Sequence, residues 1–352
     1  MRHNAARLFA VTAITASLAT LAAVPALADP ASTPAAGSIV GAGSDTTQAV
    51  FNQFSTDYNA FLTAAGNTTS PRLYSWDATG TSPVTTKTGA TSIARPNGSG
   101  AGISALNANT SATLDFARTS RGPQTGDLTT DDFVAFAKDA VTWSAKATGG
   151  NAPADLTTAD LVAIYTCTKT NWNQITDITG YTGPNATIKP YLPQASSGTR
   201  SFFLKAIGGG TPVTPGACVV TGPEENQGTD AVLNDANVVF PYSVGHYVGQ
   251  LNGHVTATDD KGVLTVRKIN NVAPLTGTNT LSAGFAATSY GRVLYNVVRH
   301  AEWTGTGTQP DALRAIFGTS GWLCTNTTAK ADIAGYGFLV LPGAACGSVT
   351  HI

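Results

Sequence analysis

The sequence has 352 residues, of which 42% are hydrophobic and 12% are charged. This apolar fraction is large enough for a packed core, which excludes a chain that is disordered throughout, and the length favours two domains. The 20 Lys and Arg residues are balanced by 21 Asp and Glu residues and form no basic run, so neither nucleic acid nor an anionic membrane is an expected partner.

Residues 1–28 have the pattern of a signal peptide. Arg2 and Arg7 form a basic start, residues 8–24 are largely apolar, and small residues precede position 29. Hydroxyl residues interrupt the apolar run, which is shorter than the roughly 20 residues of a membrane span. We therefore expect an exported protein, extracellular or periplasmic, with no membrane insertion. No cysteine lies near the cleavage site, so no lipid anchor is expected.

The chain has four cysteines, at positions 167, 218, 324 and 346. An even number of cysteines in an exported chain predicts disulfides. Of the three possible pairings we favour Cys167–Cys218 and Cys324–Cys346, because each closes a loop within one proposed domain. No Cys or His pair has the spacing of zinc ligands, so we expect neither a metal nor a cofactor.

The first elements follow a strand, turn and helix pattern. Residues 29–36 are rich in Pro, Ala, Ser and Thr and are predicted to form a flexible leader. Residues 38–40 predict a strand, and an apolar stripe from Val50 to Leu62 predicts a helix. Asp45 with Gln48 three residues later resembles a capping box, which would begin that helix near residue 45 or 46.

Two loops of small residues, at residues 97–102 and 196–199, each precede a further predicted helix. Two other helices are expected after Thr157 and Thr308, each with a Thr-x-x-Asp cap. Apolar and β-branched runs predict strands at residues 140–143, 188–192, 238–240, 263–269 and 293–298. The alternation of helices and strands indicates an α/β protein.

Three loops, at residues 43–46, 98–100 and 197–199, combine glycine with Ser or Thr at a helix start. The free N–H groups and positive dipole end of a helix N-terminus bind anions, and hydroxyls add further donors. One such loop is commonly only a cap, but three together predict a shared oxoanion site.

Catalytic motifs are absent from the sequence. It has no G-x-x-x-x-G-K-[ST], H-E-x-x-H or G-x-S-x-G run. His246, His254 and His300 are far apart in the sequence and are predicted to be surface or strand-end residues. We therefore expect a binding protein and not an enzyme.

Short motifs with a characteristic order run along the chain: residues 39–46 (IVGAGSDT), 98–100 (GSG), 114–121 (LDFARTSR), 164–165 (IY), 170–175 (TNWNQI), 194–199 (QASSGT) and 241–245 (PYSVG). In this order and spacing, the chain resembles the phosphate-binding proteins of high-affinity phosphate ABC importers. The resemblance covers nearly all of the chain after residue 28.

The resemblance implies a two-lobed type II periplasmic-binding-protein-like α/β fold with a ligand cleft between the lobes. Residues 37–140 and 291–352 would form lobe one, and residues 141–290 would form lobe two. It also implies a monomer that captures inorganic phosphate and delivers it to the membrane subunits of an ABC permease.

Carried across by position, the resemblance assigns the ligand contacts to the three loops. The matching residues are Ser44, Asp45, Thr46, Ser99, Ser197, Gly198 and Thr199. A secondary set near these loops comprises Gly98, Arg118, Ser120, Arg121 and Arg200.

Two residues of the family pattern are missing. Residues 118–121 lack the Asp that accepts the proton of hydrogen phosphate, and the Arg that precedes the Ser-Gly-Thr loop aligns near Pro193. A buried acceptor carboxylate discriminates protonated phosphate from sulfate, which has no proton to donate. We expect Asp45 to supply this carboxylate and Arg118, Arg121 or Arg200 to supply the bidentate cation.

Three alternatives remain open from the sequence. The ligand could be another oxoanion such as sulfate, because the acceptor Asp is missing. A secreted phosphatase that reuses the fold would need an activated nucleophile or a metal. An adhesion protein would fit the Thr-, Gly- and Ala-rich composition.

Overall fold

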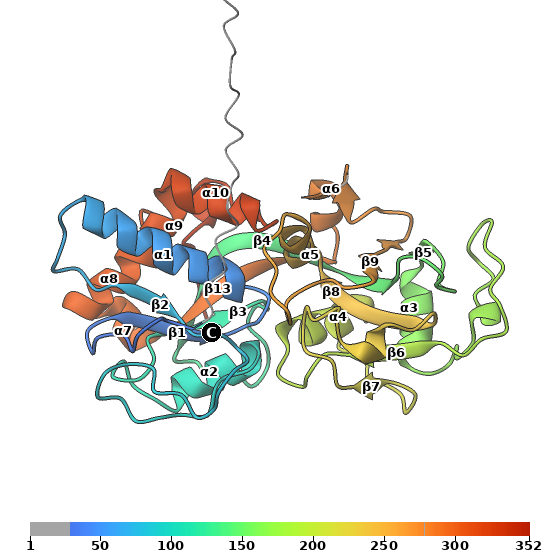
Figure 1. Ribbon diagram of the computed structural model, residues 1–352, viewed down its shortest axis with the longest axis horizontal. Coiled ribbons are helices and arrows are strands. Elements are labelled where there is room, and N and C mark those ends of the chain that lie inside the picture. The colour runs from blue at the N-terminus through green and yellow to red at the C-terminus, as the bar shows by residue number, and fades with distance from the viewer. Residues whose placement is uncertain (1–28, 278) are drawn as a thin grey trace, which may run out of the picture.

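The computed structural model describes residues 29–277 and 279–352, and it has a mixed α/β fold with two lobes side by side (Figure 1). The predicted signal peptide, residues 1–28, lies outside the described residues. Within them, one eleven-stranded sheet follows the order β2-β1-β3-β13-β4-β8-β6-β7, with β9, β14 and β15 also paired to β4. The sheet therefore continues from one lobe into the other.

The first lobe is built on parallel strands that begin the chain. Its strands β1, β2 and β3 pair in parallel around β1, and α1 and α2 cover opposite faces (Figure 1). Its elements before the first crossing are β1 (Ile39–Gly43), α1 (Gln48–Ala64), β2 (Leu73–Ser75), α2 (Ser99–Asn107) and β3 (Phe116–Thr119). The C-terminal part returns to this lobe with α7 (His300–Thr304), α8 (Thr308–Phe317), α9 (Trp322–Thr325), α10 (Thr327–Gly335), β14 (Leu339–Val340), a 3-10 turn at Gly343–Ala345 and β15 (Val349–His351).

Two long antiparallel strands, β4 (Asp131–Lys146) and β13 (Gly291–Arg299), cross between the lobes. The part of β4 up to Ala140 pairs with β13, and the part from Val141 onward pairs with β8. The chain therefore passes between lobes within one continuous strand. The lobe boundaries expected from the sequence stay a proposal, which this change of partner at residues 140 and 141 supports.

The second lobe contains the middle of the chain. Parallel pairing of β6 with β7 and β8 forms its sheet, and α3, α4 and α5 pack around it. Its elements are β5 (Asp155–Leu156), α3 (Thr158–Tyr165), a 3-10 turn at Trp172–Gln174, β6 (Lys189–Leu192), α4 (Gly198–Ile207), β7 (Val220–Thr221), a 3-10 turn at Ala231–Leu233, β8 (Val238–Ser243), α5 (Val244–Leu251), β9 (Leu264–Val266), β10 (Lys268–Ile269), β11 (Leu275–Thr276), β12 (Thr280–Leu281) and α6 (Ala283–Ala286).

Each lobe has its own apolar core. In the first, the stripe of α1 packs on the C-terminal helices, and Phe51 meets Phe136 edge to face at 5.2 Å. In the second, Trp143, Trp172 and Phe203 are fully buried among aliphatic residues. The largest clusters of the two lobes share no buried residue, so each lobe buries its own apolar surface and the space between them is free to hold polar groups.

Both disulfides of the structure lie within a lobe. Cys167–Cys218 joins the second lobe across 51 residues, and Cys324–Cys346 joins the C-terminal segment of the first lobe across 22 residues. This is the pairing favoured from the sequence. Each bridge restricts the unfolded chain without linking the lobes to each other.

Two expected helix starts differ from the structure, and a third is confirmed. Helix α1 begins at Gln48 and not at residue 45 or 46, and the capping box does not form, because the Gln48 side chain accepts a hydrogen bond from the Ala78 amide and Asp45 binds Gln194 instead. Helix α8 starts after Gly307 without a side-chain cap from Thr308. The capping box of Thr157 and Asp160 does form.

The leader at residues 29–36, expected to be flexible, is attached to the first lobe. Asp29 forms a bidentate ion pair with Arg95 at 2.7 Å, and the Pro34 carbonyl accepts hydrogen bonds from the Thr88 amide at 2.8 Å and its hydroxyl at 3.1 Å. These contacts fix a segment whose composition alone predicts no structure.

Within residues 29–277 and 279–352, the structure has no helix of the length and apolarity required to cross a bilayer.

One carboxyl pair between α1 and α10 makes stability depend on pH. Burial, together with the adjacent Asp57, raises the pKa of Asp332 to about 7, and one of its carboxylate oxygens has no hydrogen-bond partner. Because the folded pKa lies above the unfolded value, stability is lost as pH rises from about 4 through 7.

We therefore expect Asp332→Asn, which mimics the protonated form, to raise the unfolding free energy at pH 8.5 by about 1–2 kcal/mol, allowing for solvent screening, and to change it little at pH 4. Chemical denaturation at both pH values measures this, with Asp311→Asn, at an exposed position of α8, as the control. Equal stabilisation at both pH values would contradict the raised pKa of Asp332 in the folded protein.

Candidate functional site

The three loops predicted from the sequence meet between the lobes. Thr46, in the loop from β1 to α1, lies with its hydroxyl 3.2 Å from that of Thr199 at the start of α4. Ser99, the first residue of α2, lies with its hydroxyl 3.3 Å from that of Ser120 and accepts the Ser120 amide at 3.0 Å. All of these residues are buried. Helix starts from both lobes therefore face one another.

Two glycines permit this close approach. Gly43 has a φ of +129°, and a Cβ there would lie 2.6 Å from the Arg118 carbonyl. A Cβ at Gly198 would overlap the hydroxyls of Ser99 and Ser120. Glycine at position 198 thus brings the α4 N-terminus against the loops of the first lobe.

The Glu225 carboxylate lies at the centre of the hydroxyl groups. Thr46 and Ser197 donate to it from their hydroxyls, and Thr199 donates from its hydroxyl at 2.8 Å and from its backbone amide at 3.4 Å. Glu225 follows β7 in the loop at residues 222–228 and is 5% exposed. These donors, together with the dipole of α4, satisfy a carboxylate that is removed from water.

Arg292, on the crossing strand β13, supplies the cation of the site. Its Nη2 atom donates to the Thr199 hydroxyl at 3.0 Å and lies 3.5 Å from that of Thr46, while its Nε donates to Asp139 at 2.9 Å. The Arg292 Nη1 atom is buried without a hydrogen-bond partner. The ion pair with Asp139 holds the guanidinium in place across the antiparallel pair of β4 and β13.

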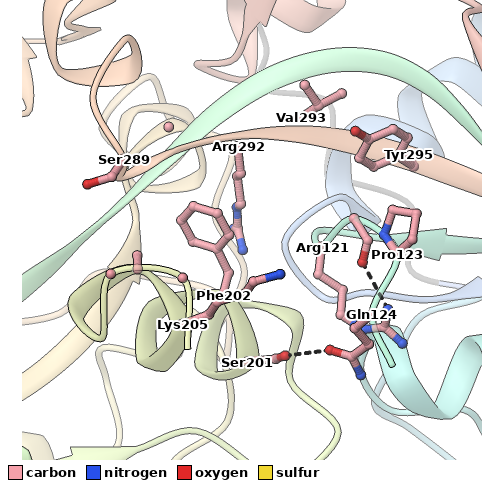
Figure 2. A pocket seen from close by; sticks show the side chains of 15 residues that line it. Arg121, Pro123, Gln124, Ser201, Phe202, Lys205, Ser289, Arg292, Val293 and Tyr295 are labelled. Carbon is pink, nitrogen blue, oxygen red and sulfur yellow. Dashed lines mark hydrogen bonds between the residues drawn. The ribbon is translucent and has the colours of Figure 1, made fainter. Parts of the chain in front are cut away.

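Arg292 also borders a cavity of about 530 Å³ between the lobes. Figure 2 shows its side chain descending from β13 towards Phe202, and the guanidinium lies 5.7 Å from the centre of that ring. Lys205 lines the same cavity, and Ser201 donates a hydrogen bond to Gln124 across it at 2.9 Å. The cavity thus brings solvent close to the cationic side of the site.

Asp45, expected to supply the acceptor carboxylate, lies beside the cluster but receives none of its hydroxyl bonds. It accepts Gln194 Nε2 at 3.0 Å. Burial, followed by the charges of Glu225 and Glu224, raises the pKa of Asp45 well above its usual value. Asp45 therefore resists ionisation, and the carboxylate among the donors is that of Glu225.

The three arginines expected to supply the cation bond elsewhere. Arg118 is fully buried and donates to the Ser44 carbonyl, to Ser75 and to the Trp76 carbonyl, and burial lowers its pKa to about 10. Arg121 pairs with Asp127 at 2.7 Å. Arg200 donates to the Pro193 carbonyl and to Thr221. The guanidinium that contacts the Thr46 and Thr199 hydroxyls is that of Arg292.

Of the other predicted residues, Ser44 is buried next to Thr46, and its hydroxyl has no hydrogen-bond partner. Gly98, the residue before α2, has a φ of +94° and packs against the Ser196 carbonyl. The adjacent Gly100 amide donates to that same carbonyl at 3.0 Å. These contacts hold α2 against the loop that precedes α4.

His246, predicted to be a surface or strand-end residue, is buried at the start of α5. Its Nδ1 donates to the Thr46 carbonyl at 2.9 Å, and its Nε2 lies 2.5 Å from Asp259. Burial alone would lower the pKa of His246, but Asp259, the Thr46 carbonyl and Glu225 together raise it to about 9. An imidazolium thus holds the Thr46 backbone from the opposite lobe.

Sequence reasoning missed Glu225, Arg292 and His246. Each reaches the site through contacts between segments that are distant in the chain. Thr46 and Glu225, for example, are 179 residues apart. The local signals were weak: two consecutive acidic residues in a Gly- and Pro-containing loop, one Arg beside a predicted strand, and one His after Ser243.

The sequence matches the PBP superfamily domain over residues 28–293, which is most of the chain, and the protein belongs to this superfamily. Solved structures with a similar fold include an ABC-type phosphate transport receptor from Vibrio cholerae, with 18% identity, 86% of this chain and 100% of that chain covered, and a TM-score of 0.55.

A structure from Clostridium perfringens, assigned as a phosphate ABC transporter substrate-binding protein and holding bound phosphate, has 17% identity, coverage of 87% and 100%, and a TM-score of 0.56. A phosphate-binding protein from Stenotrophomonas maltophilia has 14% identity, coverage of 88% and 91%, and a TM-score of 0.50. A search of curated proteins gives no match. At these identities the similarity establishes the two-lobed fold.

The raised pKa of His246 predicts a defined dependence of stability on pH. Its contribution is complete below the unfolded pKa of 6.5 and is lost as pH rises through about 9. The full effect is about 3 kcal/mol, at 1.36 kcal/mol per pKa unit. We expect wild type to exceed His246→Gln in unfolding free energy at pH 6.5 and this difference to shrink by pH 9.5. Denaturant titrations across this range measure it, and a constant difference would show that His246 is not charged in the folded protein.

Proposed function

We propose that this protein is an exported solute-binding protein that captures inorganic phosphate in the cleft between its lobes and presents it to an ABC permease. It binds and releases its ligand without converting it, and it acts as a monomer in the periplasm or outside the cell. Sulfate is the alternative ligand, because the chain lacks the acceptor Asp that would discriminate phosphate from sulfate.

The observation that carries the proposal is the set of donors around Glu225. Hydroxyls from both lobes, the Thr199 amide at the α4 N-terminus and the Arg292 guanidinium converge on one pair of carboxylate oxygens or on the hydroxyls that hold them. Such a set recognises delocalised negative oxygens, which phosphate and a carboxylate share. The residues include Thr46, Ser197 and Thr199, which the sequence resemblance assigns to the ligand.

The similar structures support phosphate as the ligand. The Vibrio cholerae protein is a phosphate transport receptor, and the Clostridium perfringens structure holds phosphate. Membership of the PBP superfamily supports a role in binding, and the signal-peptide pattern of residues 1–28 supports export. Delivery to a permease follows from this class of receptor.

Isothermal titration with phosphate and sulfate tests the proposal. We expect phosphate to bind at least about 100-fold more tightly than sulfate, a gap of roughly 2.7 kcal/mol. Equal affinities would indicate a general oxoanion site, and no heat with either anion would rule out the phosphate assignment.

A variant tests whether the ligand uses the α2 loop. Ser99 makes no hydrogen bond to Glu225, so Ser99→Ala leaves that carboxylate undisturbed. Because a hydrogen bond to a charged group contributes about 1.5–3 kcal/mol, we expect this change to weaken phosphate binding at least tenfold. Ser104→Ala, at an exposed position of the same helix, is the matched control and should bind like wild type. Equal affinities of both variants would exclude Ser99 from the site.

A further inference from the structure

The Glu225 side chain occupies the position of a ligand. Its two oxygens accept the hydroxyls of Thr46, Ser197 and Thr199 and the Thr199 amide. A hydroxyl has one proton to donate, so a bond to Glu225 is a bond that an external oxoanion cannot receive from the same atom. The carboxylate and an incoming phosphate therefore compete for the same donors.

The loop that carries Glu225 is itself anchored. The Glu225 amide donates to the Gln194 side chain at 3.0 Å, and the Asn226 carbonyl accepts hydrogen bonds from Tyr242 at 2.6 Å and from Gln250 at 2.9 Å. Tyr242 and Gln250 belong to the second lobe, whereas Thr46 belongs to the first. The carboxylate thus links the lobes from a fixed base.

Charge prevents the two anions from sharing the site. Glu224 lies in the same loop and accepts hydrogen bonds from the Asn97 side-chain amide. The small cavity beside Glu225 is lined by Asp45, Glu224 and Asp259. A dianion placed next to Glu225 in this buried, acidic surrounding would be repelled, because like charges at close range in low dielectric are strongly unfavourable.

We propose that Glu225 is an internal ligand, which fills the oxoanion subsite when no external anion is bound and must be displaced for one to enter. The proposal rests on the proposed function and deepens it. Glu225 sets the affinity of the cleft, because it restricts binding to anions that hold the hydroxyls and Arg292 better than a carboxylate does. Closure of the lobes by Glu225 and closure by ligand are alternative states.

Phosphate titration of wild type, Glu225→Ala, Glu225→Gln and Glu224→Gln tests the displacement. Both Glu225 variants should bind phosphate at least tenfold more tightly than wild type. Glu224→Gln removes an equal charge one residue away without freeing a hydroxyl donor, so its gain in affinity should be smaller than that of either Glu225 variant. Where wild type binds phosphate, unchanged or weaker binding by both Glu225 variants, or an equal gain in Glu224→Gln, would overturn the proposal.

Thermal unfolding with formate provides a measurement that does not depend on phosphate. Formate restores a carboxylate to the space that Glu225→Ala creates, so it should raise the melting temperature of this variant by at least about 2 °C more than that of wild type or Glu224→Gln. Equal effects on all three proteins would overturn the proposal. If no variant binds phosphate but formate rescues Glu225→Ala, the internal ligand stands and the phosphate assignment fails.

An independent cluster lies in the first lobe, where β4 meets β15 and the end of β13. The Asp132 side chain, 1% exposed on β4, has its two oxygens 2.8 Å from Nδ1 of His300 and 2.7 Å from Nδ1 of His351. The two imidazole rings lie 4.1 Å apart, and each histidine is nearly half exposed. Sequence spacing gave no sign of this group, because β4, β13 and β15 bring it together.

This geometry points to a site for a divalent transition-metal ion such as Zn²⁺, held by His300, His351 and Asp132. One potential ligand atom from each residue lies within 4.8 Å of the other two. Two imidazoles and a carboxylate suit Zn²⁺, and the exposed side leaves room for water to complete the coordination. Such an ion would fasten the C-terminal strand β15 to β4.

Zinc titration of the protein purified without a histidine tag tests this site. We expect one Zn²⁺ to bind and affinity to fall at least tenfold in His300→Ala and in His351→Ala, each a position whose side chain is nearly half exposed. His254→Ala, whose ring stacks on Tyr336 elsewhere in the molecule, is the control and should bind like wild type. No zinc binding by wild type, or equal binding by all variants, would overturn the assignment.

Discussion

A buried carboxylate that must be satisfied determines the organisation of the cleft. Glu225 is removed from water, and its charge is stabilised by hydroxyls and an amide that come from opposite lobes. An unpaired buried charge would cost far more than any single packing contact contributes. The helix starts bring those donors within reach, and the absence of side chains at Gly43 and Gly198 lets the loops of the two lobes approach one another.

Arg292 and Asp139 connect this cluster to the sheet. They are register partners on β13 and β4, so the guanidinium is held by the strands that join the lobes and not by a loop of either lobe. A cation in this position is equally available to groups from both sides.

Local signals in the sequence predicted much of the fold and the loops of the site. Glycine and hydroxyl residues before an apolar periodic segment identify a helix start, and this identified residues 98–100 and 197–199 beside their helices. The same reasoning began α1 too early, because Asp45 binds Gln194 from the other lobe instead of capping the helix. Glu225, Arg292 and His246 could not be predicted, because their roles follow from contacts between distant segments and from strand register, neither of which leaves a local pattern.

The continuity of β4 determines how the lobes can move relative to one another. A break between domains is commonly a loop, which bends in any direction, but here two hydrogen-bonded strands carry the chain across. Motion of one lobe relative to the other must therefore deform this ladder near residues 140 and 291, where β4 changes partner. Arg292 lies beside that point and would be displaced less than the loops that face it. The cleft would open around a nearly stationary positive charge.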